Sequence, residues 1–327
     1  MSEESFNYSD ERFADLQMLR YRLNDFDKLS LRQKCLVYCL AKATLFGRDI
    51  TFDQFGKYNL KIRKTLEAVF CWYEGNRDSK DFKALEVYLK RVWFSNGIYH
   101  HYGTEKFSPD FTEDFFREAV KSIDASKLPL EGTDVNGLLD EICPVIFNPD
   151  ILPKRVNKAD GVDLIKTSAC NYYSGVSQKE VEDYYASKKT SATEQPSWGL
   201  NSTLVKDSTG INEDVWKIGG KYGKAIEKIV YWLEKAEDFA ESEEQKNVIK
   251  LLIDYYKSGN LAEFDKYSIA WVREHGDSID FINGFIEVYG DPLGLKGSWE
   301  GIVEYRDEEA TERAQTISRN AQWFEDH

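Results

Sequence analysis

Apolar residues recur every three to four positions through most of the first 150 residues, and this spacing predicts amphipathic helices. Ser30 is a suitable N-cap for the first helix, which we expect to end at Gly47. The pair Cys143-Pro144 is expected to end the fifth helix, because proline lacks the amide hydrogen that a helix interior needs. The five predicted helices cover residues 30–46, 59–73, 82–94, 112–120 and 135–142.

The pattern changes after residue 144. Residues 144–166 and 186–198 are loop-like, and the sequence SQKE at 177–180 is a capping box that begins a short helix. Strands and helices then alternate in blocks, which predicts an α+β fold. The strands are expected over 200–206, 211–218, 280–289 and 299–305, with turns at 207–210 and 291–294, and the helices over 222–239, 247–257, 261–272 and 308–323.

The composition permits a large folded core and argues against two classes of partner. Hydrophobic residues make up 42% of the 327 residues, which is not the composition of a disordered chain. The net charge of −14 repels phosphate groups, so nucleic acid is not an expected partner. There is no run of about 18 apolar residues, so no membrane span is expected. The first residues, MSEES, are not a signal peptide as they stand.

The residues that could carry chemistry are few. Five cysteines, an odd number without the spacing of a disulfide framework, predict free and mostly buried thiols. Four histidines are present, but the zinc motif H-E-x-x-H is not, and neither is a G-x-S-x-G nucleophile motif nor a phosphate-binding G-x-x-x-x-G-K-[ST] loop. His100 and His101 are adjacent, and on a strand they would point to opposite faces and could not share a metal ion. Judged by these residues alone, the chain has no recognisable catalytic centre.

Two segments stand out because aromatic and turn residues are dense in them. They are SNGIYHHYGTEKF at 95–107 and NGFIEVYGDPLG at 283–294. The second, followed by GSWEG at 297–301, closely resembles a segment of the dipeptidyl peptidase III family. Residues 95–107, NYYSG at 171–175 and the Glu- and Lys-rich apolar stretch at 225–236 resemble other segments of that family in the same order. The resemblance covers nearly the whole chain.

The resemblance implies a fold, a cofactor and a partner. Members of the family are zinc-dependent peptidases with two lobes around a cleft. One lobe contains a β-barrel and helices, and the other binds zinc through an H-E-x-x-G-H helix that comes later in the sequence. The implied architecture is therefore a helix-rich α+β lobe with a small antiparallel β-barrel or strongly curved sheet. It would be mainly helical over 1–185, contain strands and helices over 198–306, and end in a helix over 307–327 that leads to the absent carboxyl-terminal zinc lobe. Zinc is implied for the full-length enzyme, and no metal ligand is assigned in this chain.

The resemblance also assigns site residues. Glu287 matches an acidic residue that binds the free amino terminus of a short peptide, as a carboxylate suits an ammonium group. Tyr289 matches a tyrosine that stabilises the scissile carbonyl as charge develops, which would make it catalytic. On a strand these two residues would face the same side. Tyr102 matches an aromatic residue near the first substrate residues, and its neighbour His101 and the more distant Asn283 are further candidates for substrate binding.

Two readings compete with that of an isolated peptidase lobe, which would be inactive without its zinc. One is a naturally non-catalytic module that binds peptides or another protein. The other, suggested only by the aromatic content of 14%, is a glycan-binding module. The family precedent favours the cytoplasm, and an exported, periplasmic protein would require a signal segment that had been removed.

Overall fold

A computed structural model describes residues 6–189, 195–275 and 278–327. Part of the loop expected at 186–198, and the initial MSEES, lie outside these residues. Within the described ranges no helix combines the length and the apolar content that crossing a lipid bilayer requires.

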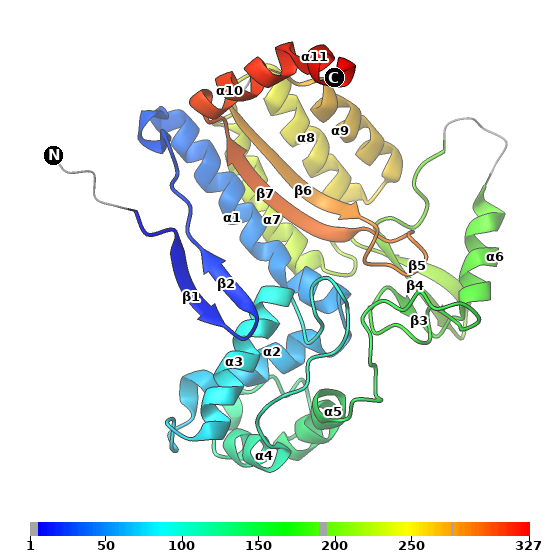
Figure 1. Cartoon of the computed structure of the whole chain (residues 1–327). Helices are drawn as coiled ribbons and strands as arrows, with labels where there is room; N and C mark the ends of the chain where they lie inside the picture. The colour runs from blue at the N-terminus through cyan, green and yellow to red at the C-terminus, as the bar shows by residue number, and fades with distance from the viewer. Residues whose placement is uncertain (1–5, 190–194, 276–277) are drawn as a thin grey trace.

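Helices dominate the structure, as the sequence predicts for an α+β fold (Figure 1). The helices are α1 (Leu31–Gln54), α2 (Asn59–Trp72), α3 (Lys80–Ser95), α4 (Glu113–Lys121), α5 (Val135–Phe147), α6 (Gln178–Lys188), α7 (Gly223–Glu237), α8 (Glu243–Ser258), α9 (Leu261–Arg273), α10 (Glu308–Arg319) and α11 (Ala321–Asp326). The strands are β1 (Ser9–Phe13), β2 (Leu16–Leu19), β3 (Tyr173–Ser174), β4 (Ser202–Asp207), β5 (Gly210–Val215), β6 (Ile279–Glu287) and β7 (Ser298–Tyr305).

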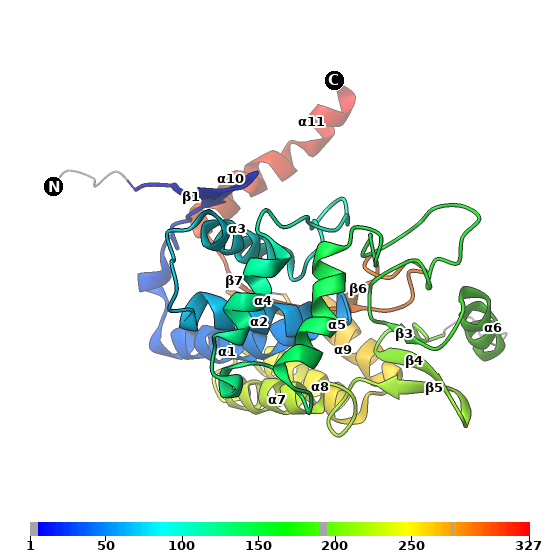
Figure 2. The same cartoon turned by 90° about the horizontal axis from the view of Figure 1, so that it is seen from below.

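The apolar side chains form two large cores and one small one. The first core lies among α2, α3, α4 and α5, which form the lower body in Figure 1. The second joins α1 to α7, α8, α9 and the β6–β7 hairpin, with Trp216 and Phe285 near its centre. The small third core lies between α6 and the β3–β4–β5 sheet. Figure 2 shows α10 and α11 extending away from these bodies.

Helix α1 is longer than predicted, because Gly47 does not end it. A capping box fixes its start, where the Ser30 side chain accepts a hydrogen bond from the Gln33 amide. At Gly47 the ring of Trp299 lies so close to the helix that a Cβ atom would be 2.2 Å from it. Glycine is therefore present for the packing of β7 on the helix and not as a helix stop. Buried Gln54, at the end of α1, then donates to Gly297 and accepts from the Trp299 amide, which ties β7 to the helix.

The prediction that Cys143-Pro144 ends α5 is also wrong. The helix continues through Pro144 to Phe147. Val145 and Ile146 are buried in the first core, and this tertiary packing outweighs the hydrogen bond that proline cannot make. The β1–β2 hairpin, whose residues are mostly exposed, was not predicted at all.

The strands do not form the expected barrel. Among the described residues there are three separate sheets, with the orders β1–β2, β3–β4–β5 and β6–β7, and none of them closes. Only β3 and β4 are parallel. The backbone hydrogen bond from the Gly297 amide to the Leu200 carbonyl joins residues that lie just before β7 and β4, so it does not continue a sheet. The expected division of the chain near residues 185, 198 and 307 stays a prediction.

Candidate functional site

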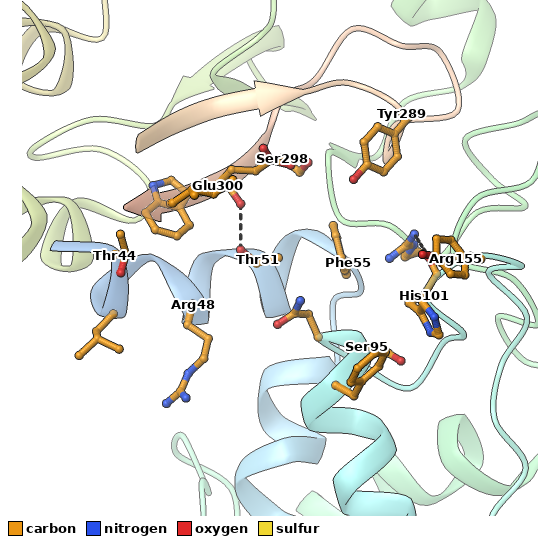
Figure 3. Close-up of a pocket in the computed structure, with 17 residues that line it drawn as sticks. Thr44, Arg48, Thr51, Phe55, Ser95, His101, Arg155, Tyr289, Ser298 and Glu300 are labelled. Carbon is orange, nitrogen blue, oxygen red and sulfur yellow. Dashed lines mark hydrogen bonds between the residues drawn. The ribbon is translucent and has the colours of Figure 1, made fainter. Parts of the chain in front are cut away.

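A hollow of about 570 Å³ lies where the two large cores meet. Helix α1 forms one side of it, the β6–β7 hairpin a second, and the end of α3 with the following loop a third (Figure 3). Its apolar walls include Phe55 and Trp299, and its polar groups include Arg48, Arg155 and Glu300. A second hollow of about 570 Å³ shares His101, Tyr102, Arg155 and Tyr289 with the first, so the two form one groove.

Tyr289 lines both hollows, but not from a strand as predicted. Strand β6 ends at Glu287, with an irregular register between Phe285 and Glu287, and Tyr289 lies in the turn that follows. The period-two argument for Glu287 and Tyr289 therefore fails. Their side chains are nevertheless close enough for the Glu287 charge to act on the tyrosine.

Two carboxylates form an acidic part at this end of the groove, and the exposed Arg48 lines the same hollow. Glu287 is exposed at the end of β6, beside the groove, and its carbonyl accepts a hydrogen bond from Ser298 Oγ at 2.9 Å. Glu300 lines the first hollow from β7. Burial, and then the charge of Glu287, raise the pKa of Glu300. Burial followed by the charges of Glu300 and Glu287 raises the pKa of Tyr289, so its phenol stays protonated at neutral pH.

His101 and Tyr102 lie in the turn after the end of α3. Tyr102 is 86% exposed, so its ring is free to contact a ligand. The rings of His100 and His101 stack with their centroids 4.4 Å apart, contrary to the expectation that they point to opposite faces, because this segment is a turn and not a strand. His100 Nδ1 accepts from the amides of Tyr102 and Gly103 and so fixes the turn. Burial lowers the pKa of His101, which favours its neutral form.

Asn283 is not part of the groove. Its side chain is buried in the second core, where Oδ1 accepts a hydrogen bond from the Tyr256 hydroxyl at 2.6 Å. Of the other four predicted site residues, His101, Tyr102 and Tyr289 line the groove, whereas Glu287 lines neither hollow and acts on Tyr289 through its charge.

Several charged residues of the groove had been given no role from the sequence, among them Glu300 and Arg155. Glu300 belongs to the GSWEG segment that carries part of the family resemblance, so the motif contained the signal. Arg155 lies in a stretch that the sequence describes only as a loop. Its backbone is fixed by hydrogen bonds to Thr104 and Cys170, and its guanidinium lies over the Phe55 ring, 4.2 Å from the centroid.

The described residues do not offer a metal site. Within residues 6–189, 195–275 and 278–327, no three His, Cys, Asp or Glu side chains lie close enough together to hold a metal ion.

Comparisons with known proteins agree with the resemblance. Dipeptidyl peptidase 3 of Homo sapiens is 22% identical over 325 residues, covering 85% of this chain and 42% of the human protein. Dipeptidyl peptidase 3 of Dictyostelium discoideum is also 22% identical, covering 93% of this chain and 46% of its own length. The chain thus spans about half the length of these relatives.

Solved structures support the same fold. The structure of DPP III from Caldithrix abyssi covers 93% of this chain with a TM-score of 0.59, and 45% of that protein is covered. Dipeptidyl-peptidase III from Corallococcus sp. strain EGB gives a TM-score of 0.57. Both proteins are 16% identical to this chain in sequence, so the similarity supports the fold alone. The family model described as Peptidase family M49 matches residues 156–325, more than half of the sequence, and the chain belongs to this family.

Proposed function

We propose that this chain is the peptide-binding lobe of a zinc-dependent dipeptidyl peptidase, which releases dipeptides from the amino terminus of short peptides. The main support is that Glu300 and Tyr289 line a groove, and that the charge of Glu287 acts on both of them, in a member of Peptidase family M49. Dipeptidyl peptidase 3 is also what its curated relatives are named. By itself the lobe is expected to bind peptides and to hydrolyse nothing.

In this proposal the acidic end of the groove receives the free amino terminus. An ammonium group placed beside Glu287 gains a charge-assisted hydrogen bond, which a blocked amine cannot make. The acidic character extends to Glu300, so the site attracts a cation before contact. Holding the amine at a fixed place determines which peptide bond lies at the reacting position.

Tyr289 is proposed to act on the scissile carbonyl. Its raised pKa keeps the phenol hydrogen in place, and a protonated phenol can donate to the oxygen as negative charge develops there. Tyr102, exposed across the groove, would pack on the first substrate residues.

A zinc ion would activate the attacking water in the complete enzyme. Because the described residues hold no group of metal ligands, we propose that the ligands belong to the remainder of a protein of the relatives' length. Metal analysis of the full-length protein is expected to find one zinc per chain, bound outside residues 1–327. A full-length protein without zinc would favour the non-catalytic peptide-binding module instead.

The assignment of Glu287 can be tested by binding. We expect Glu287→Gln in the full-length protein to weaken binding of a free-amine tetrapeptide by roughly 1.5–3 kcal/mol, the range for a hydrogen bond to a charged group. The N-acetylated peptide should bind wild type and variant equally weakly. Glu304→Gln is a matched control, because Glu304 is exposed on the same hairpin and lines a different hollow. Equal affinity of wild type and Glu287→Gln for the free-amine peptide would contradict the proposal.

A further inference from the structure

The second hollow of the groove is basic, in contrast to the end that contains Glu287 and Glu300. Its lining includes Lys154, Arg155 and Lys158 together with His101, and no Asp or Glu is among its lining residues. One of these cations is already engaged, since Lys154 lies 3.6 Å from Glu105. This local positive charge is opposite in sign to the net charge of −14 of the whole chain.

Arg155 is the central feature of this hollow, because it is buried without an anion. The whole residue is only 4% exposed. Among the described residues its guanidinium has one hydrogen bond, from Nη2 to the His101 carbonyl at 3.4 Å, and Nε has no acceptor. No carboxylate oxygen of the described residues lies within the 4.0 Å of an ion pair. Burial lowers the pKa of Arg155, which reflects the cost of this uncompensated charge.

Arg63 shows what a purely structural arginine looks like in the same molecule. It is equally buried, at 5% exposed, and it also lies over a ring, with its guanidinium carbon 4.5 Å from the Phe52 centroid. Unlike Arg155, it is paired with carboxylates, at 2.8 Å from Asp49 and 3.3 Å from Glu67. Buried charges are normally compensated in this way. The missing partner of Arg155 therefore points to an anion that comes from outside the chain.

We propose that this basic hollow, with Arg155 as its main donor and Lys158 at its rim, binds a carboxylate of the substrate peptide. The proposal rests on the proposed function, because it takes the peptide's amine to lie at the acidic end of the groove. The planar guanidinium can form two parallel hydrogen bonds to a carboxylate, and burial strengthens them. Figure 3 shows Arg155 beside His101 and below Tyr289, and Glu300 is not among the lining residues of the second hollow, where the carboxylate would lie.

Tyr289 and Arg155 line both hollows, Glu300 lines only the first, and Lys154 and Lys158 line only the second. The charges of Glu300 and Glu287 raise the pKa of Tyr289, and the charge of Arg155 lowers it. A short peptide has the complementary arrangement, with an ammonium at one end and a carboxylate at the other. Such a site selects peptides whose carboxylate, either at the carboxyl terminus or on an acidic side chain, lies a few residues from the amine.

The proposal predicts a preference that can be measured without catalysis. Affinities of the full-length protein are determined by calorimetry in the presence of a zinc chelator, with tetrapeptides that end in a free acid, in an amide, or in an amide with glutamate at the fourth position. We expect the free acid to bind wild type at least about tenfold more tightly than the amide. The long-range repulsion from these 327 residues, whose net charge is −14, acts in the opposite direction, so they can produce a preference for the acid only locally. The glutamate peptide shows whether a side-chain carboxylate serves equally well.

Arg155→Gln is expected to abolish this preference. Arg63→Gln is the control, since it removes an equally buried arginine that lines neither hollow, and it should keep the preference even if it lowers stability. Should Arg155→Gln fail to fold, Lys158→Ala at the exposed rim serves instead and should reduce the preference severalfold.

Three outcomes would count against the proposal in distinguishable ways. Equal affinity of wild type for the acid and the amide would refute the carboxylate site and leave the proposed function intact. A preference that persists in Arg155→Gln and in Lys158→Ala would place the carboxylate elsewhere. Absence of binding by every free-amine peptide would overturn the proposed function, and this inference with it.

Discussion

Lys296 is fully buried and offers a sharp test of the electrostatics of this fold. It belongs to the loop that joins β6 to β7, and its Nζ donates to the hydroxyls of Tyr185 and Ser202, the latter at 3.2 Å. Both hydroxyls also donate to Glu213. Glu213 already forms an ion pair with Lys188 at 2.6 Å, so Lys296 is a second cation near one shared carboxylate.

Burial lowers the pKa of Lys296 to about 7, although the charges of Glu213 and Asp291 act to raise it. In the unfolded chain the pKa is near 10.5. Between these two values the unfolded state binds a proton that the folded state does not, so stability rises with pH in this window. For one proton, the free energy of unfolding rises by about 1.4 kcal/mol per pH unit, and over the whole window it rises by about 4–5 kcal/mol. Below pH 7, Lys296 is protonated in both the folded and the unfolded state, and the full cost of burying its charge lowers the free energy of unfolding.

The perturbation is Lys296→Met, which keeps the length of the side chain and removes the charge. We expect the free energy of unfolding of wild type, minus that of Lys296→Met, to increase by about 1.4 kcal/mol for each unit between pH 7 and 10. Urea unfolding at several pH values measures it, and other groups that titrate in this range cancel in the difference. Lys179→Met, at an exposed position of α6, is the control and should give a flat difference over this range, because the pKa of Lys179 is raised. Parallel stability curves for wild type and Lys296→Met would refute the reasoning.

Two further substitutions test the groove and its support. Tyr289→Phe in the full-length enzyme is expected to lower kcat about 10²–10³-fold with little change in KM, as for loss of an oxyanion donor. Tyr231→Phe, at an exposed position of α7, should change neither kcat nor KM. An unchanged kcat in Tyr289→Phe would remove the proposed role of Tyr289. Gly47→Ala is expected to lower the free energy of unfolding by about 1–3 kcal/mol, because the new methyl group would meet the Trp299 ring. Gly137→Ala in α5 is its control in thermal unfolding, since the nearest atom there is the movable Thr133 hydroxyl, and equal melting temperatures for the two variants would contradict the packing role of Gly47.

The sequence determined the features that depend on neighbours along the chain. The capping box at Ser177 begins α6, the turn at 207–210 joins β4 to β5, and helical periodicity gave α2, α7 and α9 nearly to the residue. These signals are local because caps, turns and helix faces are made by residues a few positions apart. The motif around Glu287 likewise led to the family before any fold was known, and Peptidase family M49 is confirmed.

Tertiary structure decided what depends on distant residues. Gly47 continues a helix because Trp299, more than 250 positions away, packs on it, and α5 passes through Pro144 because its far side is buried. Asn283, which the sequence assigned to the site, is buried in the second core and bonded to Tyr256. Arg155, which lies in a segment predicted only as a loop, lines the groove. No local pattern contains such information, because burial and the absence of a charged partner exist only after the chain has folded. The chemistry of one end of the groove could therefore be named from the sequence, and that of the other end only from the structure.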